Sequence, residues 1–207
     1  MSNLTNDTFL TLKGASEGLY KEKGSKFIAW AGPTANLEAV KTQLEALRKQ
    51  YHDARHHCYA YRLGPDAKQV RANDDGEPNH SAGDPILGQL RSHNLTNTLV
   101  VVVRYFGGTK LGVAGLINAY RTAAAEAIAQ NEIIERVVTA PLHLKLAYEA
   151  MNDVMRIVKQ HQLGVLEQGY EATQCTMALE VRQSLVSAVR QQLGKINGVQ
   201  VEKSEPG

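Results

Sequence analysis

The sequence predicts an α+β protein with two domains, and three observations support this fold class. At 207 residues the chain fits one large domain or two small ones, since domains usually contain about 100 to 200 residues. Apolar residues make up 43% of the chain and charged residues 21%, which is ordinary for a protein with a buried core. The pattern of strands and helices restarts after Arg136, where a complete second unit begins.

The first third of the chain alternates short strands with one helix. Strands are expected at residues 8–13 and 27–31, with a turn region at 21–26 between them. A helix follows Asn36, a suitable N-cap, because apolar residues then recur at steps of three and four. These residues are Leu37, Val40, Leu44, Leu47 and Tyr51. A tyrosine-rich strand is expected at 57–63, and Gly64-Pro65-Asp66 ends it.

A loop at 66–81 leads to a second helix at 82–93, for which Asp84 is the expected N-cap and Pro85 stands in the first turn. The next strand is expected at 98–105. Its apolar run at 99–103 lacks polar alternation, which is typical of a strand buried on both faces. A glycine-rich turn at 106–112 then opens an alanine-rich helix at 113–130.

Beyond Arg136 the expected elements follow the order β-α-β-β-α-β, which is that of a ferredoxin-like domain. The strands are placed at 139–147, 165–170, 174–181 and 198–202, and the helices at 151–161 and 185–193. We therefore expect the domain boundary between residues 136 and 141. The predicted domains are residues 1–136 and residues 137–207.

Composition and charge argue against several classes of protein. The start of the chain lacks the basic and apolar pattern of a secretory signal, and the longest strongly apolar run, 99–103, is far shorter than a membrane span. The two cysteines, Cys58 and Cys175, are too few and too far apart for a disulfide framework or a four-ligand zinc site, so we expect a cytoplasmic protein. The net charge of +2 and pI of about 8.5 are low for a nucleic-acid-binding domain, so any RNA contact must use a local patch.

The glycine-rich turn is a candidate site for phosphate or nucleic acid. A buried strand, adjacent glycines, a lysine and a helix start are the parts of an anion-binding nest. The expected contributors are Arg104, Gly107, Gly108 and Lys110. The turn is neither a Walker A loop, because Val113-Ala114 stand where lysine and serine or threonine are required, nor a dinucleotide motif. The alternative is a tight strand-to-helix connection without a ligand.

An acidic loop is a second candidate site. Asp74, Asp75 and Glu77 place three carboxylates close together, and such clusters can hold a hard cation such as Mg²⁺. The Asp-Gly and Glu-Pro pairs are also turn formers, and the spacing of a calcium loop is absent, so a solvated turn is the favoured interpretation. We expect this loop to lie near the glycine-rich turn.

No catalytic residue is identified from the sequence. A cluster within seven residues contains His52, His56, His57 and Cys58. Two ligands on one strand face are too few to complete a tetrahedral zinc site. No nucleophile with a partner base can be identified. Packing at the start of a strand is the favoured interpretation. Tyr59 and Tyr61 share a strand face, where they could stack on bases or cover a core, and the core is favoured.

Three segments together resemble the IMPACT family, and the resemblance extends over the whole chain. They are Lys23-Gly24-Ser25-Lys26-Phe27-Ile28-Ala29; Asp74-Asp75-Gly76-Glu77-Pro78 with Ala82-Gly83 and Pro85-Ile86-Leu87; and Arg104-Tyr105-Phe106-Gly107-Gly108-Thr109-Lys110-Leu111-Gly112. Family members often carry Gly-Thr where this chain has His80-Ser81, so the shape or polarity of that loop can differ here.

The resemblance implies an N-terminal domain similar to domain 2 of ribosomal small-subunit protein five and a C-terminal domain similar to the ferredoxin-like domains of elongation factor G. It therefore implies a non-catalytic protein that associates with RNA, the ribosome or translation factors and acts in translation regulation and stress response, with no cofactor. Kinase regulation by eukaryotic members is not carried over, because it uses an additional domain. The alternative is an enzyme or sensor that binds a phosphorylated small molecule between Gly107 and Gly112.

Overall fold

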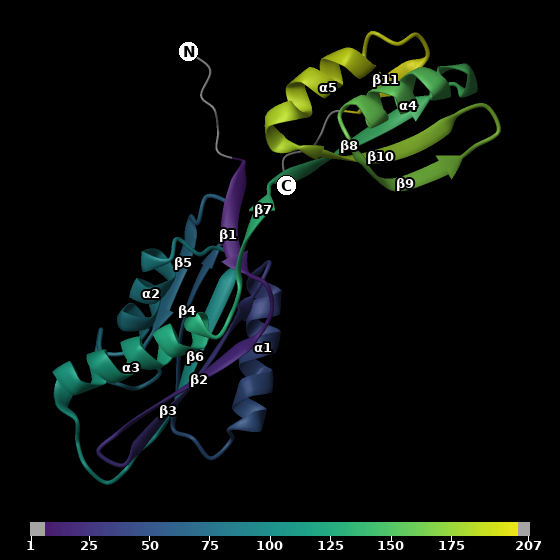
Figure 1. Cartoon of the computed structure of the whole chain (residues 1–207). Helices are drawn as coiled ribbons and strands as arrows, with labels where there is room; N and C mark the ends of the chain where they lie inside the picture. Colours follow the sequence, from purple (N-terminus) through teal and green to yellow (C-terminus); the bar gives the residue numbers. More distant parts are fainter. Residues whose placement is uncertain (1–6, 203–207) are drawn as a thin grey trace. The chain divides into compact units, whose positions relative to one another are not determined.

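The structure is a computed structural model that describes residues 7–202. Helices and strands are mixed throughout, which confirms the coarse fold class predicted from the sequence. Contacts divide the chain into two compact units (Figure 1). The N-terminal unit comprises residues 9–136, and the C-terminal unit comprises residues 137–202 together with Asp7 and Thr8.

A five-stranded antiparallel sheet in the order β2-β3-β6-β4-β5 forms the centre of the N-terminal unit. Its strands are β2 (Ser16–Glu22), β3 (Ser25–Pro33), β4 (His56–Leu63), β5 (Gln69–Asn73) and β6 (Thr98–Tyr105). Helices α2 (Gly83–Ser92) and α3 (Gly112–Ala129) cover one face, and α1 (Leu37–Gln50) covers the other (Figure 1). A separate two-stranded sheet pairs β1 (Thr8–Leu12) with β7 (Ile133–Val137).

The central strand β6 has side chains in both cores of this unit. Val100 and Val102 pack with α2 and α3, whereas Leu99 and Val101 pack with α1. Because successive side chains of a strand point to opposite faces, a strand covered on both sides needs an apolar residue at every position. The run at 99–103 therefore forms the doubly buried strand that the sequence predicted.

The helix ends show one success and one error of the sequence prediction. Asn36 caps α1, since its side chain accepts the N–H of Ala39 at 2.9 Å. The expected cap of α2 was wrong: Asp84 lies inside the first turn, and the cap position has no side-chain bond of its own. A more distant aspartate, Asp74, accepts the first N–H groups of that helix instead.

Three strands were not predicted. β2 covers most of the segment before the turn, so the turn expected at 21–26 shrinks to Lys23 and Gly24, which both have positive φ angles. β5 lies within the segment that was expected to be loop, and β7 lies beyond the end of α3. All three occupy sheet edges or the two-stranded sheet, where few apolar residues are needed.

The C-terminal unit contains one four-stranded sheet in the order β11-β8-β10-β9, with antiparallel neighbours. Its elements in chain order are β8 (Thr139–Leu146), α4 (Met151–Gln160), β9 (Gly164–Tyr170), β10 (Cys175–Arg182), α5 (Val186–Leu193) and β11 (Val199–Val201). Apolar side chains of β8 and β10 pack with both helices on one face. Asp7 belongs to this unit through a paired contact with Arg182, at 2.8 and 2.9 Å.

Within residues 7–202, no helix combines the length and apolar character that a bilayer crossing requires.

Candidate functional site

A buried ion pair lies at the end of β6. The Arg104 guanidinium donates to the Glu77 carboxylate at 2.6 Å, and the side chains are only 8% and 4% exposed. Glu77 accepts a second bond, at 2.8 Å, from the hydroxyl of Tyr120 in α3. These contacts join the acidic loop, the central strand and the helix that follows the glycine-rich turn.

Cys58 extends this network but is not suited to be a nucleophile. Its thiol lies 3.0 Å from the Asp74 carbonyl oxygen and 3.3 Å from the Tyr120 hydroxyl. Burial raises the pKa of the Cys58 thiol and the pKa of Tyr120 far above their ordinary values. Because only the thiolate attacks or binds metals well, Cys58 serves packing and hydrogen bonding, the role favoured from the sequence.

Two aromatic rings flank the guanidinium of Arg104. Its central carbon lies 5.6 Å from the ring centres of both Phe27 and Phe106, within the range of cation–π attraction. Phe27 is fully buried, whereas Phe106 is 58% exposed. Arg104 Nε has no hydrogen-bond partner among the residues that the structure describes.

Two hollows open beside Arg104 and Phe106, which line both of them. The smaller has a volume of about 360 Å³ and reaches the start of α3, with Lys110, Leu111 and Val113 on its walls. The larger has a volume of about 590 Å³ and reaches the loop before β4, with Arg55 on its wall. Both volumes lie in the range of small-ligand sites.

The glycine-rich turn has specific backbone requirements. Gly107 packs against the β2–β3 turn so closely that a Cβ would collide with the backbone of Gly24. Its N–H donates to Ser25 Oγ at 3.1 Å, so this donor is already engaged. Gly108 has a φ of +87°, a backbone conformation that favours glycine, although no atom lies within 4 Å of the position a Cβ would take. Lys110 is exposed at the rim of the smaller hollow.

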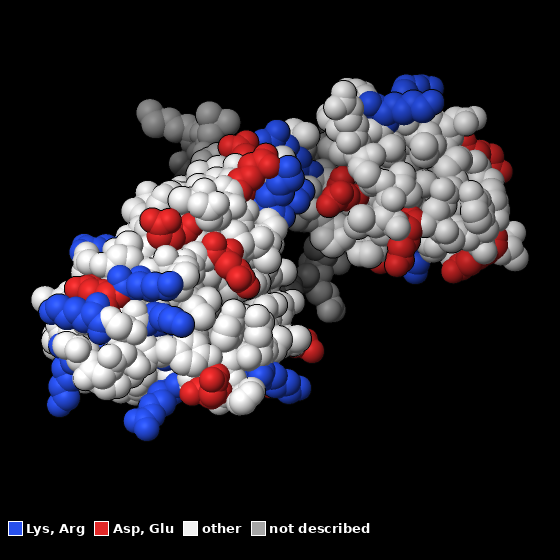
Figure 2. Space-filling view, turned by 60° about the horizontal axis from the view of Figure 1, so that its bottom comes forward, with Lys and Arg blue, Asp and Glu red and all other residues white. Residues whose placement is uncertain are grey.

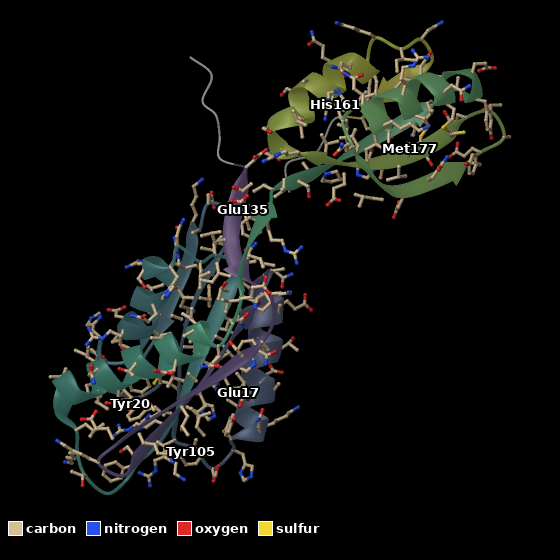
Figure 3. All side chains as sticks on the ribbon, viewed as in Figure 1. Glu17, Tyr20, Tyr105, Glu135, His161 and Met177 are labelled. Atoms are coloured by element: carbon tan, nitrogen blue, oxygen red, sulfur yellow. The ribbon has the colours of Figure 1, made fainter. Side chains whose placement is uncertain are left out.

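Exposed cations lie at the two hollows and on the neighbouring β2–β3 hairpin. Tyr105 lies at this end of the unit (Figure 3) and hydrogen-bonds to Asp53 at 2.7 Å, which brings the loop before β4 close to the end of β6. We call this surface the basic end, and its exposed cations are Lys21, Lys23, Lys26, Arg55 and Lys110. Within residues 7–202, none of these five side chains forms an ion pair. Figure 2 shows Lys and Arg side chains spread over this end, with some Asp and Glu between them.

The carboxylates of the acidic loop point to different partners. Asp74 accepts the N–H groups of Ala82 and Gly83, at 3.0 and 2.8 Å, and so caps α2 from outside the helix. Asp75 accepts the N–H of His57 at 2.7 Å and contacts Arg48 at 3.2 Å. Together with the pairing of Glu77, these bonds direct the three carboxylates to different partners. Among residues 7–202, no group of three or more His, Cys, Asp or Glu side chains is placed to hold a metal.

The aromatic residues at the site differ from those considered from the sequence. Tyr59 and Tyr61 stack with ring centres 6.4 Å apart and pack with the α1 core, the role favoured from the sequence. Phe106 is the exposed ring, and Tyr120 is the buried hydroxyl that binds Glu77. Phe106 follows a buried strand and precedes two glycines, which is a signal for an exposed position. Tyr120 is hidden within an ordinary apolar helix face.

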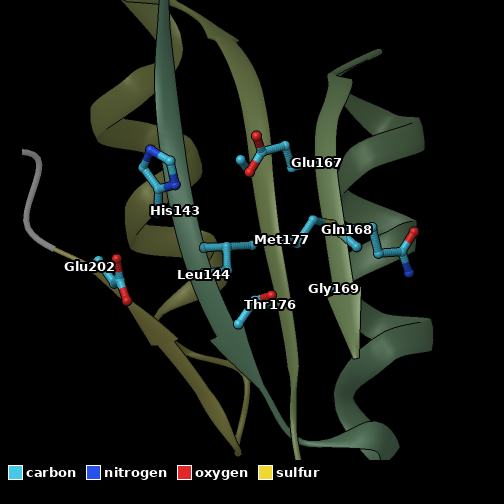
Figure 4. Close-up of a pocket in the computed structure, with 9 residues that line it drawn as sticks. His143, Leu144, Glu167, Gln168, Gly169, Thr176, Met177 and Glu202 are labelled. Carbon is cyan, nitrogen blue, oxygen red and sulfur yellow. The ribbon is translucent and has the colours of Figure 1, made fainter. Parts of the chain in front are cut away.

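A further hollow of about 460 Å³ lies in the C-terminal unit, on the sheet face opposite α4 and α5 (Figure 4). Its polar lining includes His143, Glu167 and Glu202. Lys145 pairs with Glu202 at 3.3 Å, which offsets one of the two negative charges. The lining therefore has no surplus of positive charge.

Comparisons with known proteins identify the relatives of this chain. The model of the Impact N-terminal domain matches residues 23–128, a range that contains every residue of the basic end except Lys21. The IMPACT family member YvyE of Bacillus subtilis is 32% identical over 163 residues, or 79% of this chain and 75% of the relative. The IMPACT family member YigZ of Escherichia coli is 34% identical over 152 residues, or 72% of this chain and 74% of the relative.

A solved structure described as the crystal structure of a hypothetical protein superposes with a TM-score of 0.74 and 28% identity. The superposition covers 97% of this chain and 99% of that one, so the fold is shared over nearly the whole length. With the family model matching half of the chain and two relatives above 30% identity over most of it, this protein belongs to the IMPACT family.

Proposed function

We propose that this protein binds RNA without catalysing a reaction and acts on the ribosome or with translation factors in translation regulation. The observation that carries this proposal is the basic end, whose five exposed cations form no ion pair within residues 7–202 and of which Arg55 and Lys110 line the hollows beside Arg104. Unpaired cations on one surface attract the phosphate backbone and gain free energy by releasing its counterions. The patch is local, which fits the modest net charge of +2 for the whole chain.

The two units have separate parts in this proposal. Residues 1–136 form an RNA-binding domain like domain 2 of ribosomal small-subunit protein five, and residues 137–207 form a ferredoxin-like domain. The β-α-β-β-α-β order and the antiparallel sheet of the second unit support the latter assignment. The hollow of the C-terminal sheet contains Glu167 and Glu202, so its charge is less suited to RNA than that of the basic end. A cytoplasmic location and a part in stress responses follow from the family resemblance.

Within the basic end, we assign phosphate contacts to Lys110 and to the glycine-rich turn. Gly108 lets the backbone approach a ligand, whereas Gly107 holds the turn against the β2–β3 hairpin. Arg104 lines both hollows, and because Glu77 balances its charge, it contributes mainly through its contact with the Phe106 ring. Asp74, Asp75 and Glu77 serve as scaffold, because each accepts hydrogen bonds that fix neighbouring elements.

The test is RNA binding by a Lys110→Ala variant over a series of salt concentrations. We expect a folded protein whose binding free energy is weaker by about 1–2 kcal/mol, as for the loss of one charge-assisted contact. The slope of log affinity against log salt should fall by about 0.7 for a single strand, because one phosphate contact is lost. Lys41→Ala is the matched control, since this exposed lysine lies on α1 across the sheet.

Unchanged affinity and salt slope in folded Lys110→Ala protein would refute the assignment of this lysine. If Lys110→Ala and Lys41→Ala weakened RNA binding equally, the RNA would bind on a surface other than the basic end.

A second candidate function is the binding of a phosphorylated small molecule by an enzyme or sensor. The smaller hollow favours it, since its apolar walls and the exposed Lys110 at its rim suit a compact anionic ligand. A thermal-shift screen with nucleotides, phosphosugars and short RNAs separates the two functions. Tight, salt-insensitive binding of a single metabolite would favour the second candidate.

A further inference from the structure

We infer that the basic end binds RNA as a single strand, with one unpaired base stacked on Phe106 in the smaller hollow and the next nucleotide in the larger one. This inference rests on the proposed RNA-binding function and names the form of RNA that the site takes. It follows from the position of Phe106, the lining of the hollows and the distribution of charge.

The ring of Phe106 is exposed but held in place. A single exposed apolar side chain is common on protein surfaces and has no meaning by itself. Here, however, the Arg104 guanidinium lies against the ring, and the next residue, Gly107, is fixed by its bond to Ser25 and by its close contact with Gly24. An anchored, exposed ring can stack on a base at a low entropic cost.

The smaller hollow offers an apolar surface next to positive charge. Leu111, Val113 and Leu116 line it beside Phe106, and Val113 is 52% exposed. Lys110 stands at the same hollow, with the start of α3. A nucleotide has the same two parts, a flat base with apolar faces and a charged phosphate. The chemistry of the hollow therefore matches one nucleotide unit of a strand.

The larger hollow provides room for a neighbouring nucleotide. It shares Arg104 and Phe106 with the smaller hollow, so a strand that crosses the ring enters both. Arg55 and His56 line it together with Asp53, whose carboxylate accepts the Tyr105 hydroxyl. The exposed Lys23 and Lys26 belong to the β2–β3 hairpin, whose turn contacts Gly107. Positive charge thus continues from one hollow to the hairpin.

Stacking distinguishes single strands from duplexes. In an A-form duplex the bases are stacked on one another and paired, so they cannot enter a hollow, whereas unpaired bases can turn out and stack on aromatic rings. A surface that used only its lysines would bind both forms. A surface that uses Phe106 binds the single strand more tightly.

The experiment measures fluorescence anisotropy with three labelled probes: an unstructured RNA of about ten nucleotides, a duplex of the same length, and a mononucleotide. The variants are Phe106→Leu, which keeps an apolar side chain without a ring, and Phe106→Tyr, which keeps the ring. Tyr170→Leu is the control, because Tyr170 is an exposed aromatic residue, 68% exposed, in the C-terminal unit. Thermal unfolding checks that each variant is folded.

We expect the wild-type protein to bind the single strand at least tenfold more tightly than the duplex. Phe106→Leu should weaken single-strand binding about tenfold and leave duplex binding unchanged, since stacking on one base is worth about 1–3 kcal/mol. Phe106→Tyr and Tyr170→Leu should bind like the wild type. These results together would support the inference.

Other results separate the failure of this inference from that of the proposed function. Salt-dependent binding of strand and duplex alike, unaffected by Phe106→Leu, would overturn the stacking and leave RNA binding in place. No binding of either RNA at low salt would overturn both. If the mononucleotide bound as tightly as the single strand, the inference that the site takes a strand would be refuted, and the small-molecule function would be favoured.

Discussion

Removing the carboxylate of Glu77 should destabilise the N-terminal unit more than removing an exposed carboxylate. The Glu77→Ala change leaves Arg104 with its charge in a site where only 8% of its side chain is exposed. It also removes the acceptor of the Tyr120 hydroxyl, which lies at 2.8 Å. Each of the two hydrogen bonds to a charged group is worth about 1.5–3 kcal/mol. Removing one partner of a buried ion pair costs about 3–5 kcal/mol. Both values predict that the unfolding free energy falls by about 3–5 kcal/mol.

The single tryptophan of the chain makes this loss measurable. Trp30 lies in β3 of the N-terminal unit, so its fluorescence during urea unfolding reports that unit alone. With a slope of about 2 kcal/mol per molar urea, a loss of about 4 kcal/mol lowers the unfolding midpoint by about 2 M. Asp84→Ala is the matched control, because Asp84 is an exposed carboxylate paired with His80 at 2.6 Å. Its loss should cost less than about 1 kcal/mol.

A double variant, Glu77→Leu with Arg104→Leu, tests the same reasoning from the other side. It removes both charges together, so most of the lost stability should return. A Glu77→Ala protein within about 1 kcal/mol of the wild type would refute the argument, because solvent in the hollows would then satisfy Arg104 without its partner.

Three other predictions concern different parts of the molecule. Hydrogen bonding to Arg182 lowers the pKa of Asp7, so the carboxylate stabilises the C-terminal unit above pH about 4 and this stability is lost as the pH falls. In Asp7→Asn, the melting temperature followed by circular dichroism should therefore depend less on pH in the acid range. An unaltered pH dependence of the melting temperature would contradict this role. Gly107→Ala should lower the unfolding free energy of the N-terminal unit by about 1–3 kcal/mol, because the new Cβ collides with backbone; unchanged Trp fluorescence melts would show that the turn moves aside freely. The hydrogen bond to the Asp53 carboxylate raises the pKa of Tyr105 to about 12. In Asp53→Asn, ultraviolet titration should find that the pKa of one tyrosine falls toward the ordinary value of 10.0. An unshifted titration would exclude the hydrogen bond between Tyr105 and Asp53.

Sequence patterns predicted the elements whose apolar residues repeat with a clear period. The helix α1 and the strand β6 fall in this class, as does the element order of the C-terminal unit. β2 escaped prediction because its inward positions do not form an apolar repeat. Gly18 sits against the backbone of Ala127 and Tyr20 packs against the core, while Leu19 lies on the other face and is 53% exposed. β5 escaped because this edge strand of five residues carries little apolar signal: Ala72 packs against the core, and Val70 is 39% exposed.

The candidate site could be predicted only in part for a related reason. Arg104 and Lys110 were identifiable from the glycine-rich turn, whose composition is local. The pairing of Arg104 with Glu77, by contrast, joins residues far apart in sequence, and nothing in either segment specifies the partner. Likewise, the bonds of Asp74 to the start of α2 depend on the loop conformation that the sequence alone does not reveal.

The backbone contact between Gly24 and Gly107 has a consequence for protein engineering. Neither glycine leaves room for a Cβ, so the β2–β3 turn and the glycine-rich turn fit together as one steric unit. Loop exchange between relatives should therefore transfer both turns at once, because a chimera that carries only one of them combines two surfaces shaped for other neighbours. For the same reason, an affinity tag or an inserted peptide placed in either turn would displace the other. Insertions that leave binding intact belong at the opposite end of the sheet, in the turn between β4 and β5.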